Sequence, residues 1–171
     1  MTAILHIPDI KFNPYCIADC SQNKKRGVTR VLNMLSSICL KETKLEFLTS
    51  LAKKSLPLEC CALLLGKKNT DNLGEISVSD VISVKNNDSS PISFSVDPDE
   101  LFKGYHLSES RNIHVVGIFH SHPAEPFPSS IDKSYMKINP VVWLIYSTVT
   151  NETRAYIFES RLKEVRLRVM A

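Results

Sequence analysis

Short apolar runs separated by polar turns make up most of the chain from residue 36 onward. Alternating apolar and polar positions, and short continuous apolar runs, are both typical of β-strands. On this basis the pattern predicts strands over residues 37–40, 59–66, 76–84, 113–121, 141–147, 154–158 and 165–169. The polar residues 69–74 predict the turn that joins the second and third of these strands as a hairpin.

Helix signals occupy three gaps between the strands and predict helices over residues 43–56, 98–110 and 129–138. Thr43 and Glu46 have the spacing of a capping box, which satisfies free N–H groups at a helix start. Asp97 followed by Pro98 is a preferred N-cap with proline at the first helical position. Strands and helices alternate first and antiparallel hairpins follow. We therefore expect an α/β fold with a mixed β-sheet flanked by helices.

The first 35 residues differ from the rest of the chain. They show no sustained periodicity, and they hold the whole net charge of +3, because acidic and basic residues balance after residue 35. We expect a basic N-terminal extension over residues 1–35, partly disordered, and one domain over residues 36–171. Alternatively, translation begins at Met34. The cluster at residues 24–26 is short, and such runs are usually solvated, so contact with nucleic acid is not expected.

Composition narrows the class of protein. With 43% apolar and 23% charged residues, the chain resembles a globular protein. No apolar run approaches the roughly 20 residues that span a bilayer, so no membrane contact is expected. The five cysteines are odd in number and include the adjacent pair Cys60 and Cys61, which indicates free thiols rather than a disulfide framework. Together with a start that lacks an export leader, these features predict a cytoplasmic protein.

The strand at residues 113–121 ends in a candidate metal site. His120 and His122 are two positions apart, and such side chains share one face of a strand, so their imidazoles should lie side by side. Asp132 can add a third ligand once the proline-rich loop turns the chain back. Two imidazoles and one carboxylate suit a single Zn²⁺ ion that keeps one position open for water, which is the catalytic arrangement. A lone His-x-His pair, however, is often incidental.

Hydrolysis by such a site also needs a base and a donor for the developing oxyanion. Glu59 is the candidate base, because a charged residue at the head of an apolar strand needs a reason to be there. Ser129 is placed to supply the hydroxyl donor. Each has a structural alternative. Glu59 can be a satisfied buried acid, and Ser129 with Asp132 can be only a helix cap.

These residues together resemble the JAMM, or MPN+, zinc metalloproteases of the Mov34/PAD-1 type, in compact archaeal or bacterial form. The family pattern is a Glu, then His-x-His-Pro, then Ser-x-x-Asp, and it stands here as Glu59, His120 to Pro123, and Ser129 to Asp132. The resemblance covers about residues 36–171, with Ala62 where glycine is frequent. It implies a cytidine-deaminase-like architecture. It also implies zinc bound by His120, His122 and Asp132, with Glu59 as general base and Ser129 as stabiliser of the tetrahedral intermediate.

The resemblance also implies a substrate, a bond that follows the C-terminal Gly-Gly of a ubiquitin-like protein. Two glycines can lie extended in a narrow channel and pair with a sheet edge as an added strand. Residues 88–96 are the candidate lip, with Phe94, Ser95 and Val96 as substrate-binding residues. Phe127, in the loop beside the metal, either covers the substrate or belongs to the core. Deubiquitinase-like or desampylase-like activity with broad specificity is the first hypothesis.

Two other functions and one side feature stay open. The enzyme could instead process the tail of a sulfur-carrier protein with release of cysteine, or the chain could be a noncatalytic MPN-type scaffold. Cys61 is two residues after Glu59, so on one strand both would share a face and the thiol could approach the metal. The alternative is that Cys61 is a small core residue.

Overall fold

A computed structural model describes residues 35–69, 74–88 and 96–171. Within these ranges all of the predicted strands and helices are present, with bounds that differ by a few residues. The turn predicted at residues 69–74 lies largely outside the described residues. The elements are β1 (Ser37–Lys41), α2 (Glu42–Ser55), β2 (Cys61–Lys68), β3 (Glu75–Val84), α3 (Pro98–Ser110), β4 (His114–His122), α4 (Ser130–Ile138), β5 (Val142–Ser147), β6 (Thr153–Phe158) and β7 (Leu162–Met170).

The strands form one mixed sheet that closes on itself. Their order is β1-β3-β2-β4-β5-β6-β7, and β1 pairs in parallel with both β3 and β7, which completes a closed barrel. The pair β4–β5 is also parallel, and the remaining neighbours are antiparallel. The expected α/β class with a mixed sheet is therefore confirmed, but the expectation of a sheet flanked by helices is corrected, because the sheet closes into a barrel. Closure depends on pairing between the first and last strands, which no local pattern encodes.

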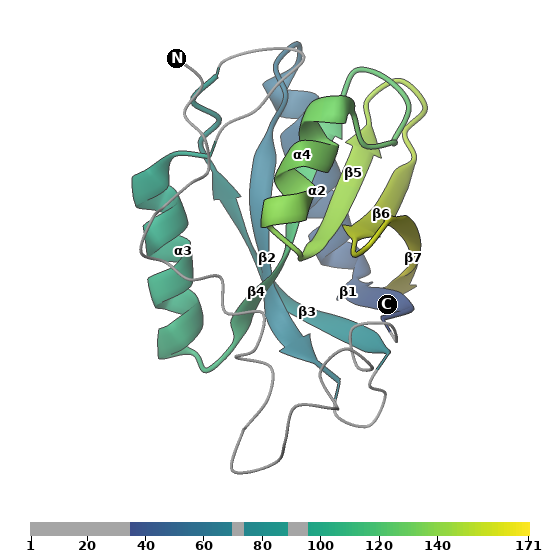
Figure 1. Cartoon of the computed structure of the whole chain (residues 1–171). Helices are drawn as coiled ribbons and strands as arrows, with labels where there is room; N and C mark the ends of the chain where they lie inside the picture. The colour runs from purple at the N-terminus through teal and green to yellow at the C-terminus, as the bar shows by residue number, and fades with distance from the viewer. Residues whose placement is uncertain (1–34, 70–73, 89–95) are drawn as a thin grey trace.

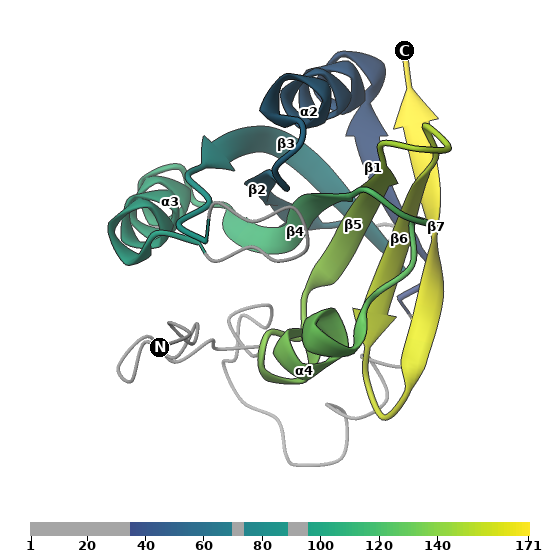
Figure 2. The ribbon, with the colours of Figure 1, turned by 90° about the horizontal axis from the view of Figure 1, so that it is seen from above.

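The helices lie on two sides of these strands (Figures 1 and 2). One buried cluster combines Leu48 and Ala52 of α2 with side chains from all seven strands, including Ile38, Leu64 and Leu144. A second cluster combines side chains from the other strand face with α3 and α4, whose Leu101 and Met136 it contains. Seen from above, α2 and α4 are on opposite sides of the strands (Figure 2). The two-sided burial explains why β2 and β5 are almost continuously apolar.

The N-terminal ends of α2 and α3 differ in how they are capped. The capping box expected at Thr43 is wrong, because α2 begins at Glu42 and its N-cap Lys41 makes no side-chain capping hydrogen bond. The prediction for α3 is confirmed, since Asp97 accepts hydrogen bonds from the N–H groups of Asp99 and Glu100. A Thr-x-x-Glu spacing is only one requirement of a capping box, and here the strand β1 runs directly into the helix.

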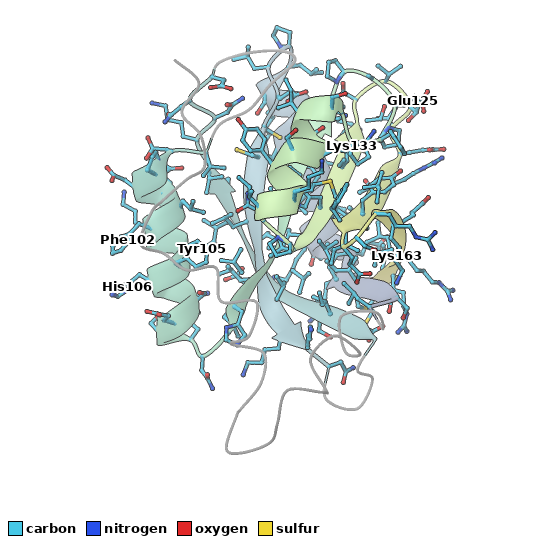
Figure 3. All side chains as sticks on the ribbon, viewed as in Figure 1. Phe102, Tyr105, His106, Glu125, Lys133 and Lys163 are labelled. Carbon is cyan, nitrogen blue, oxygen red and sulfur yellow. The ribbon has the colours of Figure 1, made fainter. Side chains whose placement is uncertain are left out.

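The outward side of α3 carries exposed aromatic side chains. Phe102 and His106 point away from the sheet, whereas Tyr105 points toward it (Figure 3), and Phe102 is 58% exposed.

None of the helices that the described residues form combines the length and apolarity needed to cross a membrane.

Gly66 in β2 is the position where an added side chain should disturb the sheet most. A Cβ atom there would lie 2.0 Å from the carbonyl oxygen of Ser77 in β3. We expect Gly66→Ala to lower the free energy of unfolding, measured by urea denaturation, by about 1–3 kcal/mol or more. Gly104→Ala in α3 is the control, because its Cβ meets only the flexible end of Leu63 and alanine favours a helix. Equal losses in the two variants would contradict this.

Candidate metal centre

The end of β4 brings the two histidines together. His120 and His122 lie side by side as the alternation of a strand predicts, with 2.9 Å between their Nε2 atoms. Their rings are edge to face, with centroids 4.6 Å apart. Both are buried, His120 completely. Two ring nitrogens converging on one point inside the protein form the start of a metal site.

Asp132 reaches the same point from the first turn of α4. Its Oδ1 lies 3.4 Å from Nε2 of His120, and its Oδ2 lies 3.2 Å from Nε2 of His122. The same carboxylate completes a capping box, because Oδ2 accepts from the N–H of Ser129 and the Ser129 hydroxyl accepts from the N–H of Asp132. The structural and functional interpretations of this pair therefore coexist: the cap fixes the carboxylate where the histidines need it.

The donor set fits a zinc ion. Ligand atoms of His120, His122 and Asp132 all lie within 4.8 Å of one another, and all three residues are buried. Zinc–nitrogen and zinc–oxygen bonds of about 2.1 Å at tetrahedral angles place ligand atoms about 3.4 Å apart. The separations of 2.9, 3.4 and 3.2 Å are close to that spacing. The three residues could hold a metal without rearrangement of the backbone.

The charges in the site are arranged for cation binding. Burial lowers the pKa of His120, which keeps its imidazole neutral as a ligand must be. Burial acts against the ionised form of Asp132, but hydrogen bonds from the two histidines outweigh it and hold the pKa of this carboxyl well below its usual range. Burial also lowers the pKa of His122, whereas Asp132 and Glu59 raise it, with a net increase. The result is a buried carboxylate that stays ionised and that attracts positive charge.

Glu59 lies beside this group without joining it. Its Oε1 is 4.0 Å from Nε2 of His122, and the side chain is buried. Burial raises its pKa to about 7, with an opposing effect of His122 and a smaller increase from Asp132. Strand β2 begins at Cys61, so Glu59 precedes the strand rather than heading it as predicted. A carboxyl with a pKa near neutrality, close to the metal ligands, can take up and release a proton.

The raised pKa of Glu59 predicts a pH effect on the metal-free protein. Between the ordinary value of 4.5 and the folded value of about 7, the folded state holds a proton that the unfolded state has lost. Stability therefore falls as the pH rises through this interval. We expect Glu59→Gln to remove this part of the decline, measured as the free energy of unfolding against pH after chelation. Parallel curves for the two proteins would contradict the assignment.

Neighbouring residues that the sequence did not indicate hold the histidines in place. The N–H and the hydroxyl of Thr148 both donate to the carbonyl oxygen of His122, at 2.9 and 3.1 Å. The ring of Trp143 lies edge to face with His120, with centroids 5.6 Å apart, and its indole N–H donates to the carbonyl of Asn139. Thr148 follows β5, which pairs in parallel with β4. Its contact depends on that register, which the local sequence does not show.

The residues expected to bind substrate are only partly described. Phe94 and Ser95 lie outside the described residues. The side chain of Val96 is buried in the second cluster, so only its backbone could meet a ligand. Phe127 is 50% exposed, and its ring lies edge to face with Tyr156 and 4.7 Å from Nζ of Lys133. Figure 3 places Lys133 on α4 and Glu125 on the loop between β4 and α4.

Cys61 is placed as a core residue rather than a ligand. It is aligned with His120 across the β2–β4 pair, but its thiol donates to the carbonyl of Val84. Burial raises the pKa of the thiol far above neutrality, so in the metal-free protein Cys61 is a protonated thiol. The argument that Cys61 shares a strand face with Glu59 does not apply, because Glu59 lies outside β2.

Comparison with known proteins gives matches over the same part of the chain. A family model described as prokaryotic homologs of the JAB domain matches residues 43–159. A desampylase of Pyrococcus furiosus is 38% identical over 116 residues, which cover 66% of this chain and 77% of that protein. Glu59 and the three candidate ligands all lie within the range that the family model matches.

Two solved structures share the fold. A protein from Desulfitobacterium hafniense has a TM-score of 0.68 at 28% identity, and the match covers 78% of this chain and 92% of that one. A protein from Salinibacter ruber has a TM-score of 0.59 at 20% identity, with 77% and 90% covered. The fold of the described residues is thus one that has been observed before.

Proposed function

The chain belongs to the family of prokaryotic homologs of the JAB domain, the JAMM or MPN+ family that its motifs resemble, and from this membership we propose that it is a zinc-dependent isopeptidase. The bond it hydrolyses follows the C-terminal Gly-Gly of a ubiquitin-like modifier. One observation carries the proposal: the buried group of His120, His122 and Asp132 with Glu59 beside it, 4.0 Å from His122. Such a carboxylate next to a metal-ligand set is what amide hydrolysis at neutral pH requires.

Each of the site residues has a distinct task in the proposed reaction. A zinc ion held by His120, His122 and Asp132 would polarise the scissile carbonyl and lower the pKa of a water molecule. Glu59 takes a proton from the attacking water and passes it to the departing lysine amine. In the metal-free protein its pKa is about 7, so the carboxyl can exist in both the protonated and the ionised form near neutral pH. The Ser129 hydroxyl donates a hydrogen bond to the oxyanion. Its oxygen accepts a hydrogen bond from the N–H of Asp132, so the hydroxyl proton is the part that remains to be donated.

Two considerations support the proposed substrate class: the name of one relative and the chemistry of the tail. The Pyrococcus furiosus relative is named a desampylase, and a modifier-removing activity of the same kind is the simplest assignment for this chain. A Gly-Gly tail has no side chains, so it can approach a buried metal site closely and pair through its backbone. The backbone at Val96, which pairs with Asn86 in an antiparallel bridge, is where such a strand would add.

Removal of the Ser129 hydroxyl should affect both catalysis and stability. We expect Ser129→Ala to lower kcat by about 10²–10³-fold, because the oxyanion loses a donor. Loss of the N-cap of α4 should lower the free energy of unfolding by about 1 kcal/mol. Ser129→Thr keeps a hydroxyl at the same place and should retain most of both. Steady-state kinetics with denaturant unfolding measures the two effects, and an unchanged kcat in Ser129→Ala would remove Ser129 from the reaction.

The proposal is tested with two substrates and one metal control. One substrate carries a ubiquitin-like protein on a lysine side chain, and the other carries a single cysteine after its Gly-Gly. Zinc-loaded protein should release the modifier from lysine, chelation should stop the reaction, and added zinc should restore it. Cleavage of the cysteine substrate alone would favour the sulfur-carrier function. Failure with both substrates, in protein that holds zinc, would count against an isopeptidase.

A further inference from the structure

The main chain around Glu59 is held by two side chains from other strands or loops. Because Glu59 lies before β2, a run of ladder hydrogen bonds does not set its position. The Ser121 hydroxyl accepts from the N–H of Cys60 at 3.1 Å, and the N–H of Ser121 donates to the carbonyl of Cys60 at 3.2 Å. These bonds tie the residue after Glu59 to the strand that carries both histidines.

Asn86 holds the carbonyl of Glu59 itself. Its Nδ2 donates to this oxygen at 2.9 Å, while its Oδ1 accepts from the N–H of Asp88 at 3.1 Å. Both ends of the amide are therefore engaged, which fixes its orientation. A donor group is required toward Glu59, because a carbonyl oxygen can only accept.

The place of Asn86 in the fold gives this contact a functional meaning. Asn86 pairs with Val96 in an antiparallel bridge, and Asp97 next to Val96 is the N-cap of α3. The N–H of Asp97 donates to the carbonyl of Lys85 at 3.3 Å, which holds the same junction together. The side-chain amide of Asn86 thus connects Glu59 to the backbone at Val96, where the tail of the modifier would pair in the proposed function.

We propose that Asn86 is a positioning residue that orients Glu59 for proton transfer through the hydrogen bond to its carbonyl oxygen. The inference rests on the proposed function, in which Glu59 must come within about 2.6–3.2 Å of a proton that it abstracts. Displacement of such a group by about 1 Å can reduce the rate about 10²-fold. The contact acts on Glu59 and leaves the three metal ligands untouched.

The isosteric variant Asn86→Asp tests the inference most sharply. It keeps the acceptor for Asp88 and replaces the donor toward Glu59 with an oxygen. Asn87→Ala is the matched control for Asn86→Ala, because it removes an amide donor one residue away, where the side chain contacts Asp97 and not Glu59. Asn86→Ala removes the donor without adding charge. All four proteins, including the wild type, are used as full-length chains loaded with zinc.

We expect both Asn86 variants to lower kcat by about 10²-fold with KM and zinc content unchanged, and Asn87→Ala to keep the wild-type kcat. A purely structural role would instead lower the melting temperature or the zinc content in step with the rate. Amide hydrogen exchange at Cys60 gives a readout without turnover, and it should accelerate in the Asn86 variants only.

The outcomes separate this inference from the proposed function. If wild type cleaves the conjugate and Asn86→Asp has the same kcat, or loses rate only together with zinc, the inference is overturned. If zinc-loaded wild type does not cleave, the isopeptidase proposal fails. Exchange at Cys60 then decides alone: faster exchange in the Asn86 variants supports the positioning contact, and unchanged exchange overturns it.

Discussion

Replacement of Glu59 by glutamine is expected to slow hydrolysis strongly while the metal stays bound. Glutamine keeps the shape of the side chain but cannot accept the proton of the attacking water at any working pH. Loss of a general base typically costs 10²–10⁴-fold, so kcat should fall by about this factor. Glu59 lies 4.0 Å from the nearest ligand nitrogen and is not one of the three ligands, so zinc stoichiometry should not change.

Two measurements on the same samples test this expectation. Steady-state cleavage of the modifier conjugate gives kcat, and elemental analysis gives bound zinc. Glu125→Gln is the matched control. Glu125 is an exposed acid on the loop between β4 and α4, and its replacement by glutamine removes the same charged group near the site. Its kcat should equal that of the wild type. A Glu59→Gln protein that retains activity with full zinc would exclude Glu59 as the base.

Replacement of Asp132 by asparagine should have the second largest effect, on metal binding itself. The variant keeps an oxygen that can accept from the N–H of Ser129, so the cap of α4 should largely remain. It loses the one anionic ligand of the set. Loss of a residue that only supports a ligand costs about 10–100-fold in affinity, so we expect zinc affinity to fall by more than about 100-fold.

Calorimetric titration with zinc measures this loss directly. In addition, zinc should raise the melting temperature of the wild type and should leave that of Asp132→Asn nearly unchanged, because only binding to the folded state stabilises it. Asp97→Asn provides the matched control, since the Asp97 carboxylate also accepts backbone N–H hydrogen bonds at a helix start, that of α3, but is not one of the three ligands. Equal zinc affinity in Asp132→Asn and wild type would remove Asp132 from the site.

The parts of the site that the sequence predicted are those that depend on local geometry. His120 and His122 converge because alternate positions of a strand share a face, and this needs only that β4 is a strand. Ser129 and Asp132 form the helix cap that the sequence offered as their structural alternative, because its spacing is local as well. Glu59 was found as an acid out of place in an apolar run and through the family resemblance.

The parts that the sequence did not predict depend on distant partners. Closure of the sheet requires β1 to pair with β7, and no local pattern specifies that contact. Thr148 and Asn86 reach His122 and Glu59 only through the register of neighbouring strands and loops. The prediction of a capping box at Thr43 is wrong for the converse reason. Thr43 and Glu46 have the right local spacing, but α2 already begins at Glu42, so Thr43 lies inside the helix.

The central claim is that this chain hydrolyses an isopeptide bond after Gly-Gly, and the identity of the bond cut tests it most directly. Zinc-loaded protein is incubated with a lysine-linked modifier in water labelled with heavy oxygen, and both products are weighed intact by mass spectrometry. The account predicts a modifier that ends in Gly-Gly with one labelled oxygen in its carboxylate, and a substrate lysine restored to a free amine. Cleavage at another bond, or an intact conjugate beside protein that holds zinc, would contradict it.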